Sequence, residues 1–151
     1  MGEIQHALEE FFQSEDWAYT QVEGNPILRL SFRGKNGNWN CFAQAREEKH
    51  LFLFYSVCPI NVPEMKRSQA AEFLTRANYG LPLGSFEMDY TDGEVRFKTS
   101  VDVEGIDLSP LMINHLVYTN IGTFDRYLPG IMVVIYGNAS PEEAIQQIEA
   151  G

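Results

Sequence analysis

Apolar and polar residues alternate with a period of two in several short segments of the chain, as is typical of half-buried β-strands. Three candidate turns separate these segments, at Asn36-Gly37, Glu48-Lys49 and Asp92-Gly93. Asn-Gly and Asp-Gly favour two-residue type I′ turns, because these residues tolerate positive φ best. Together the turns predict one continuous antiparallel sheet whose inner face is filled by alternating apolar side chains.

A hairpin centred on Asn36-Gly37 has a defined pairing register. On the inner face it pairs Phe32 with Cys41, Leu30 with Ala43 and Leu28 with Ala45. On the outer face it pairs Arg33 with Asn40, Ser31 with Phe42 and Arg29 with Gln44. Turn chemistry and alternation therefore agree on this register.

A hairpin centred on Asp92-Gly93 follows the same logic. Its inner pairs are Tyr90 with Val95, Met88 with Phe97 and Phe86 with Thr99. On the outer face Asp89 opposes Arg96 and Glu87 opposes Lys98, and each opposite-charge pair favours the register by about 0.2 to 1 kcal/mol. These charges are thereby explained by strand pairing, and no sequence feature indicates paired catalytic carboxylates.

The turn near Glu48-Lys49 is the weakest of the three, because neither residue favours positive φ. Its register sets Phe54 opposite Ala43 and Phe52 opposite Ala45, large residues against small ones. The residues left on the other side of the sheet are Phe42, Leu51, Leu53, Tyr55 and Val57. The strand from His50 to Cys58 is then apolar on both faces.

An antiparallel sheet usually buries one face and shows polar residues on the other, so the second face of this strand needs a cover. We favour a helix of the same chain, since domains are layered. The alternative is a partner protein or a second copy of the chain, because large apolar patches mark interaction sites. Pairing of an extended peptide with a sheet edge is a further route.

Helices are predicted on both sides of the strands. The segment from Ile4 to Ser14 carries Ile4, Leu8, Phe11 and Phe12 at helical spacing, and Trp17 and Tyr19 lead into a first strand that turns near Gly24-Asn25. A second helix is expected to begin at Pro63 and to end at Gly80. Its apolar stripe consists of Ala70, Phe73, Leu74 and Ala77.

A third helix is predicted to begin after Ser109-Pro110, with Pro129-Gly130 breaking or kinking it. Its buried stripe is Ile113, Leu116, Val117, Ile121, Phe124 and Leu128. The segment from Ile131 to Tyr136 suits a buried helix or a short strand, and we favour a helix. Ser140, Pro141 and Glu143 match a capping box that opens a terminal helix. The order α-β-β-β-β-α-β-β-α-α makes this an α+β fold, an antiparallel sheet packed with N-terminal, middle and C-terminal helices.

Length and charge bound the function. With 151 residues, 44% of them hydrophobic, the chain is expected to form a single domain over residues 1–151. Eleven Lys and Arg against 21 Asp and Glu give a net charge of −10, which disfavours binding to nucleic acid or anionic lipid. The first residues lack the apolar core of a secretory signal, and the longest apolar run is far too short to span a bilayer. We therefore expect a soluble, cytoplasmic protein.

Candidate chemistry is sparse. The two cysteines, Cys41 and Cys58, are expected to be buried reduced thiols, diagonal to each other on one face of the sheet. His6, His50 and His115 have no spacing typical of a metal site. We find no phosphate loop, dinucleotide fingerprint or nucleophile elbow, so we predict no catalytic residues, no metal and no cofactor.

Arg76 and Arg126 form the one alternative site. Their guanidinium groups suit a carboxylate or phosphate ligand, although they equally suit internal ion pairs. A pocket between the third helix and the sheet, near these arginines, would indicate a small-ligand sensor or an uncharacterised enzyme.

Four strings point to a family. The stretch EFLTRANYGLPLGSFEMDYTDGEVRFKTSVDVEG from Glu72 to Gly105 and DRYLPGI from Asp125 to Ile131, with NGNWNCFA and FYSVCPINVPE upstream, resemble the YbjN-domain proteins, in particular a cyanobacterial and plastid-lineage branch. The resemblance covers nearly the whole chain. It implies a fold similar to type III secretion chaperones, which are small, acidic, commonly dimeric proteins that bind extended client segments. The family brings no catalytic residues with it.

The function expected from these observations is a non-enzymatic protein-binding module, chaperone-like or a regulatory adaptor, that forms a homodimer and binds a protein client. Phe42, Leu51, Leu53, Tyr55 and Val57 are the candidate protein-binding residues.

Overall fold

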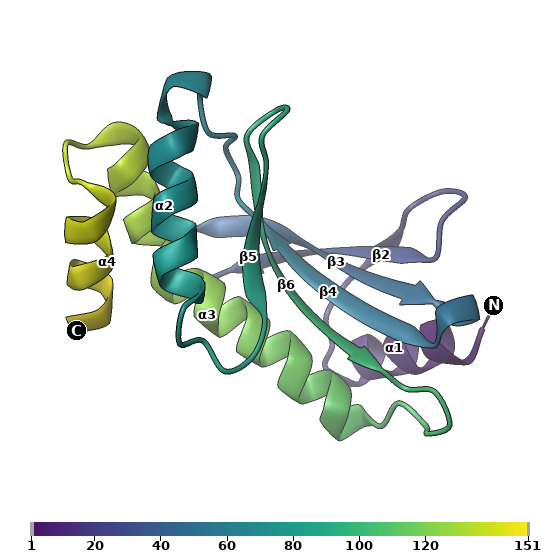
Figure 1. The fold of residues 1–151 in the computed structure, drawn as a ribbon. Coiled ribbons are helices and arrows are strands. Elements are labelled where there is room, and N and C mark those ends of the chain that lie inside the picture. The colour runs from purple at the N-terminus through teal and green to yellow at the C-terminus, as the bar shows by residue number, and fades with distance from the viewer. Residues whose placement is uncertain (1, 151) are drawn as a thin grey trace.

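The structure is a computed structural model that describes residues 2–150. Its elements follow the expected order (Figure 1). They are α1 (Glu3–Ser14), β1 (Thr20–Gln21), β2 (Ile27–Arg33), β3 (Asn38–Arg46), the 3₁₀ turn η1 (Glu47–Lys49), β4 (Leu51–Val57), the 3₁₀ turn η2 (Glu64–Lys66), α2 (Arg67–Asn78), β5 (Ser85–Asp89), β6 (Glu94–Asp102), α3 (Pro110–Tyr136) and α4 (Pro141–Ala150). The α+β prediction is confirmed.

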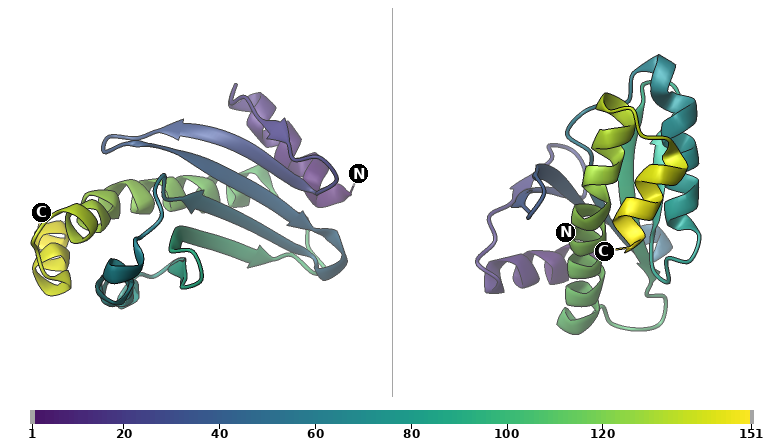
Figure 2. Two further views of the ribbon diagram at one scale, coloured as in Figure 1. Left: turned by 90° about the horizontal axis from the view of Figure 1, so that it is seen from above. Right: turned by 90° about the vertical axis from the view of Figure 1, so that its left-hand side faces the viewer.

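The six strands form one antiparallel sheet in the order β1-β2-β3-β4-β6-β5. Helix α3 contacts β4 and β6, and α1 contacts β3. Both helices lie beneath the same face of the sheet, whereas α2 lies beside β5 and α4 packs on α2 and α3 (Figures 1 and 2). We call the face toward α1 and α3 the inner face and the opposite one the outer face. None of the helices in the described part of the chain is both long and apolar enough to cross a membrane.

The β2–β3 hairpin differs from its predicted register by two residues. Leu30 lies opposite Cys41 and Leu28 opposite Ala43, so the pairing centred on Asn36-Gly37 is wrong. The loop contains four residues, 34–37, and the Gly34 N–H donates to the carbonyl oxygen of Gly37 at 2.8 Å. Because a shift of two preserves the alternation, every side chain still lies on its predicted face.

The β5–β6 hairpin shows the same error. Phe86 lies opposite Phe97 and Met88 opposite Val95, because the connection is a four-residue loop whose last residue, Gly93, has φ +81°. The predicted charge pairs are thereby corrected: Glu87 faces Arg96, and Asp89 faces Glu94. In both hairpins the glycine closes a longer loop instead of occupying a two-residue turn.

The β3–β4 register is confirmed, with Phe54 opposite Ala43 and Phe52 opposite Ala45. The turn itself is the 3₁₀ segment η1, and the residue with positive φ is His50, at +57°. The alternation of large and small apolar residues therefore identified a register that the turn chemistry left weak.

The helices carry two corrections. Helix α2 begins at Arg67 instead of Pro63, which precedes the 3₁₀ turn η2. Helix α3 continues through Pro129 to Tyr136, so of the two predicted effects of Pro129, a break or a kink, the break is absent, and the helical interpretation of residues 131–136 is confirmed. The capping box is present: Ser140 N–H donates to Glu143 Oε1 at 3.0 Å, and Glu143 N–H to Ser140 Oγ at 3.1 Å.

A buried polar network holds α3 against the sheet. The Asn120 side chain is fully buried, and its Nδ2 donates to the carbonyl oxygens of Phe54 and Phe97 at 2.9 and 3.1 Å. Ser56 Oγ donates to Asn120 Oδ1 at 2.7 Å and accepts from the indole of Trp39 at 3.0 Å. Because all these groups are paired, the network fixes the position of α3 beneath β4 and β6.

Candidate functional site

The candidate binding surface lies on the outer face of β3 and β4. Strand alternation brings the five predicted residues together there: Phe42 lies opposite Tyr55, and Leu53, Leu51 and Val57 lie opposite Gln44, Arg46 and Asn40. The predicted clustering of these side chains on one face is confirmed. Their role in binding stays a prediction.

No helix of residues 2–150 covers this surface. Seen from above, the strands of the sheet lie in front of α1 and α3, and α2 and α4 lie at one end (Figure 2). Our preferred expectation, that a helix of the chain covers the second face, is therefore wrong.

Side chains from neighbouring strands give a partial cover instead. The guanidinium carbon of Arg96 lies 4.3 Å from the centre of the Tyr55 ring, and Tyr55 and Leu53 are only 7% and 6% exposed. Phe42, Leu51 and Val57 are partly exposed. A long charged side chain commonly covers an apolar surface in this way while its head stays in water. Of the five predicted residues, those accessible to a partner are thus Phe42, Leu51 and Val57.

The surface is hollowed beside Phe42. One hollow of about 210 Å³ is lined by Ile27, Phe42, Gln44, Tyr55, Val57, Glu94 and Arg96. A neighbouring hollow of about 410 Å³ shares Phe42, Val57 and Glu94 with it and extends to Ser31, Asn38 and Asn40. The outer face therefore has concave regions in which a side chain of a partner can be buried.

Glu87 organises the charges at one side of the surface. Its carboxylate accepts from Arg96 Nε at 2.8 Å and from Lys98 Nζ at 3.0 Å. Burial alone would raise the pKa of Glu87, but the hydrogen bonds and positive charges of Lys98 and Arg96 outweigh it and hold the pKa below its ordinary value. The Glu87 carboxylate thus binds both Arg96 and Lys98, and it orients Arg96 over the Tyr55 ring.

One backbone position on each side of the sheet is occupied by a side chain of the same chain. At the β5 edge, the Asn78 amide pairs with the backbone of Phe86: Nδ2 donates to the carbonyl oxygen at 3.1 Å, and Oδ1 accepts from the N–H at 2.7 Å. Next to β2, the Trp17 indole donates to the carbonyl oxygen of Ser31 at 3.1 Å. Such contacts protect an edge from pairing with another strand, so peptide addition at the edge is the less favoured route.

The two arginines of the alternative site lie on different helices. Arg76, at the end of α2, pairs with Glu72 at 2.8 Å and with Glu142 of α4 at 3.8 Å. Arg126, on α3, lies with its guanidinium carbon 5.3 Å from the centre of the Tyr127 ring. The ion pairs explain Arg76, and a ligand site at these arginines stays a prediction.

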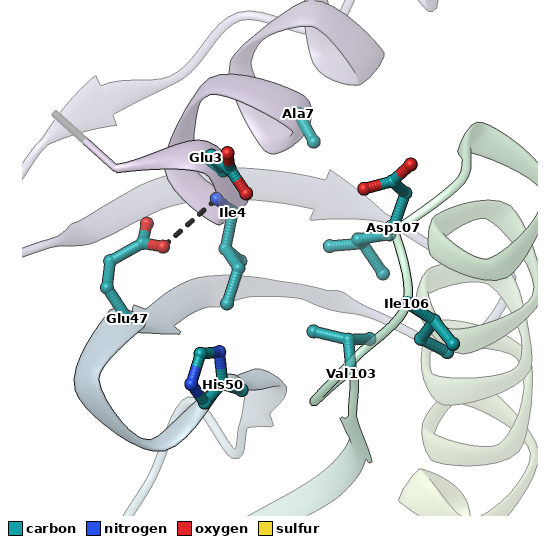
Figure 3. Close-up of a pocket in the computed structure, with 9 residues that line it drawn as sticks. Glu3, Ile4, Ala7, Glu47, His50, Val103, Ile106 and Asp107 are labelled. Carbon is teal, nitrogen blue, oxygen red and sulfur yellow. Dashed lines mark hydrogen bonds between the residues drawn. The ribbon is translucent and has the colours of Figure 1, made fainter.

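Another hollow, of about 380 Å³, lies between the start of α1, η1 and the loop after β6 (Figure 3). Its wall includes His50 and the carboxylates of Glu3, Glu47 and Asp107. The Glu47 carboxylate accepts from the backbone N–H groups of Ile4 and Gln5 at 3.1 and 2.9 Å, so it caps α1. Between residues 2 and 150, no group of three His, Cys, Asp or Glu side chains is placed to hold a metal ion.

Sequence reasoning missed the residues that frame the surface. Arg29 lies beside Phe42 and Lys98 beside Tyr55, in one row across four strands. The two-residue error in the β2–β3 register had placed Gln44 opposite Arg29, and the pairing of β4 with β6 had no turn to reveal it. Asn120 carried no signal of its contacts with β4 and β6, because these join parts of the chain that are far apart in sequence.

Comparisons with known proteins agree with this architecture. The family model "YbjN: Putative bacterial sensory transduction regulator" matches residues 5–131. Among solved structures, the chain is similar to "Crystal structure of YbjN, a putative transcription regulator from E. coli", with a TM-score of 0.62 and 11% sequence identity over 87% of each chain. At that identity the likeness shows the fold alone. No curated protein matches the chain.

Proposed function

The chain belongs to the YbjN family, and from this premise we propose that it is a non-enzymatic regulatory protein that binds another protein on the outer face of its sheet. In this proposal the partner contacts Phe42, Leu51 and Val57, and the more buried Leu53 and Tyr55 support them. The description of the family as a sensory transduction regulator supports a regulatory role.

The observation that carries the proposal is the uncovered outer face. All helices that pack on the sheet do so on its inner face or at its β5 side, yet the outer face carries partly exposed Phe42, Leu51 and Val57. Apolar side chains gathered over hollows on an otherwise polar surface are typical of interaction sites. A partner that covers them gains free energy from the apolar area removed from water.

The partner in this proposal is a protein. The net charge of −10 disfavours the phosphate backbone of nucleic acids. The E. coli relative is described as a transcription regulator, and regulation through contact with a protein is the form that suits an acidic chain. A homodimer and a chaperone-like action on a client are the finer parts of this proposal, and the cyanobacterial branch and the likeness to type III secretion chaperones stay predictions.

The test uses substitutions at the accessible residues of the surface. Phe42→Asp and Val57→Asp each place a carboxylate at a partly exposed apolar position of the outer face. Leu53 and Tyr55 are not substituted, because they are too buried to tolerate a charged side chain. Leu111→Asp on α3, at a side chain that is 63% exposed, is the matched control. Circular dichroism establishes that each variant is folded.

Affinity purification of the tagged chain from its native cell, followed by sedimentation of the purified protein, then measures binding. We expect Phe42→Asp and Val57→Asp to lose a co-purifying protein or self-association that Leu111→Asp retains. Equal retention by all three folded variants would contradict binding at the outer face.

A further inference from the structure

We propose that the segment bound on the outer face is acidic and extended and lies across the strands, with carboxylates at positions i and i+4 and an apolar side chain at i+2. This inference rests on the proposed function and specifies the chemistry of its partner.

The distribution of charge is the first observation. Five of the eleven Lys and Arg residues lie on the outer face, at Arg29, Arg33, Arg46, Arg96 and Lys98. Only four of the 21 acidic residues share that face, at Glu87, Asp89, Glu94 and Asp102. The outer face thus carries nearly half of the cations but only a fifth of the acids, so an anionic segment meets less repulsion there than on the rest of this acidic molecule.

The arrangement of these cations is the second observation. One register row crosses the sheet from Arg29 through Phe42 and Tyr55 to Lys98. Strands in a sheet are spaced by about 4.8 Å, so the two cations at the ends of the row are about 14 Å apart at their Cα atoms. An aromatic pair therefore lies between two positive charges.

An extended chain advances by about 3.3 Å a residue, and its alternate side chains share one side. Positions i and i+4 are then about 13 Å apart and point toward the same surface, with i+2 midway between them. A segment lying along the row thus brings carboxylates to Arg29 and Lys98 and an apolar side chain to Phe42. The hollow of about 210 Å³ beside Phe42 and Tyr55 receives that side chain.

The cations of the row have capacity for a further anion. Among residues 2–150, no carboxylate oxygen lies within 4.0 Å of the Arg29 side-chain nitrogens. Lys98 shares the single carboxylate of Glu87 with Arg96. Glu94 lines the hollow at one end, so the carboxylates of the partner belong beside Arg29 and Lys98 and away from Glu94.

The sheet edges favour this crossing orientation. Asn78 occupies the backbone groups of Phe86 at the β5 edge, and Trp17 occupies Ser31 O next to β2. These contacts hinder strand addition at Phe86 and Ser31, and the proposed segment instead contacts the outer face through side chains.

The test measures binding of short labelled peptides to the full chain by fluorescence anisotropy. The probe peptide carries Asp at i and i+4 and Leu at i+2, with Ser and Gly elsewhere. One control peptide has Lys at both acidic positions, and another has the second Asp at i+3. Arg29→Glu is the test variant, and Lys49→Glu, at an exposed lysine in η1, is its matched control.

We expect the i, i+4 peptide to bind best, and its affinity to fall about fivefold to tenfold in Arg29→Glu but not in Lys49→Glu. Raising the salt concentration to about 0.5 M should also weaken binding of the i, i+4 peptide, because the cations of the row are exposed. Equal binding of the Lys peptide or the i+3 peptide, or an unchanged affinity in Arg29→Glu, would overturn the inference.

Further outcomes separate this inference from the proposed function. If Phe42→Asp abolishes capture of the native partner while no acidic peptide binds, the inference fails and the proposed function stands. If neither the native partner nor any peptide depends on Phe42, both fail. Tighter binding of a single-stranded oligonucleotide than of the peptide, or self-association lost in Arg29→Glu, identifies a different occupant and also overturns the inference.

Discussion

The side-chain amide of Asn36 donates a hydrogen bond of 2.9 Å to the carbonyl oxygen of Asp125, the residue four positions before Pro129 in α3. Proline has no N–H, so the helix cannot supply a donor to this carbonyl. Asn36 provides the missing donor from the β2–β3 loop. In return, the Asp125 carboxylate accepts from the backbone N–H groups of Lys35 and Asn36 at 2.8 and 2.9 Å.

Asn36→Ala should lower the free energy of unfolding by about 1 to 3 kcal/mol, because it leaves the Asp125 carbonyl without its donor. The loss should be smaller in a Pro129→Ala background, where residue 129 regains an N–H for that carbonyl. A double-mutant cycle by urea unfolding measures this coupling.

Asn38→Ala, at an exposed residue of the same hairpin, is the control for this cycle and should change the unfolding free energy little. An equal cost of Asn36→Ala in the two backgrounds would show that the bond to Asp125 does not compensate for the proline.

Asn78→Ala should expose the edge of β5. The substitution removes both hydrogen bonds to Phe86, so the amide hydrogen of Phe86 should exchange faster with solvent and the chain should associate more readily as its concentration rises. Hydrogen exchange and sedimentation measure these effects. Thr75→Ala, at an exposed position on α2, is the matched control, and an unchanged exchange rate at Phe86 would rule out the protective role.

These contacts show where sequence reasoning succeeds and where it stops. The faces of the strands follow from local alternation, so Phe42 and Tyr55 were assigned to the correct face although one hairpin register was wrong by two residues. The Asn36-Gly37 pair does not form the expected type I′ turn, because Asn36 instead donates hydrogen bonds to the carboxylate and the carbonyl oxygen of Asp125. Whether Pro129 breaks or only kinks the helix could not be decided from the sequence for the same reason, since the compensating donor comes from a distant loop.

The candidate site follows the same division. Its apolar members could be predicted from the two-sided pattern of β4, which is local. The cations that frame the site could not be predicted. Lys98 lies beside Tyr55 only because β4 pairs with β6, and these two strands are separated in the sequence by a helix and another strand. Whether a helix would cover the face depended on the packing of α1 and α3, which alternation does not encode.

The two cysteines should resist thiol reagents in the folded protein. Burial raises the pKa of Cys41 to about 12, against weaker opposing hydrogen bonds from Ser56 and Trp39, and burial also raises the pKa of Cys58. Both thiols are free and buried, as predicted, and the thiolate is the reactive form. At pH 8, a colorimetric thiol reagent should therefore react with the native chain only after denaturant is added. Rapid reaction of the native chain would contradict this burial.

The same shifts predict how stability changes in alkali. Above pH 9 the thiols of the unfolded chain lose their protons while the native Cys41 thiol retains its own, so the unfolded state binds fewer protons and the free energy of unfolding falls as pH rises toward 12. The free energy of unfolding of Cys41→Ser should fall less steeply with pH than that of the parent over this range. Urea unfolding at several pH values measures both slopes. An identical slope in both proteins would contradict the shift.

Glu87 should give stability the opposite dependence on pH in acid. Burial alone would raise its pKa, but Lys98 and Arg96 lower it below the ordinary value of 4.5, so the unfolded state takes up the proton first as pH falls. The stabilisation is therefore complete above pH 4.5 and is lost as pH falls through the lower native pKa. Glu87→Gln should unfold at a lower urea concentration than the parent at neutral pH, and the difference should shrink in acid. Glu104→Gln, at an exposed carboxylate, is the control. A constant difference between Glu87→Gln and the parent across this range would show that Glu87 stabilises the fold by packing and not by its charge.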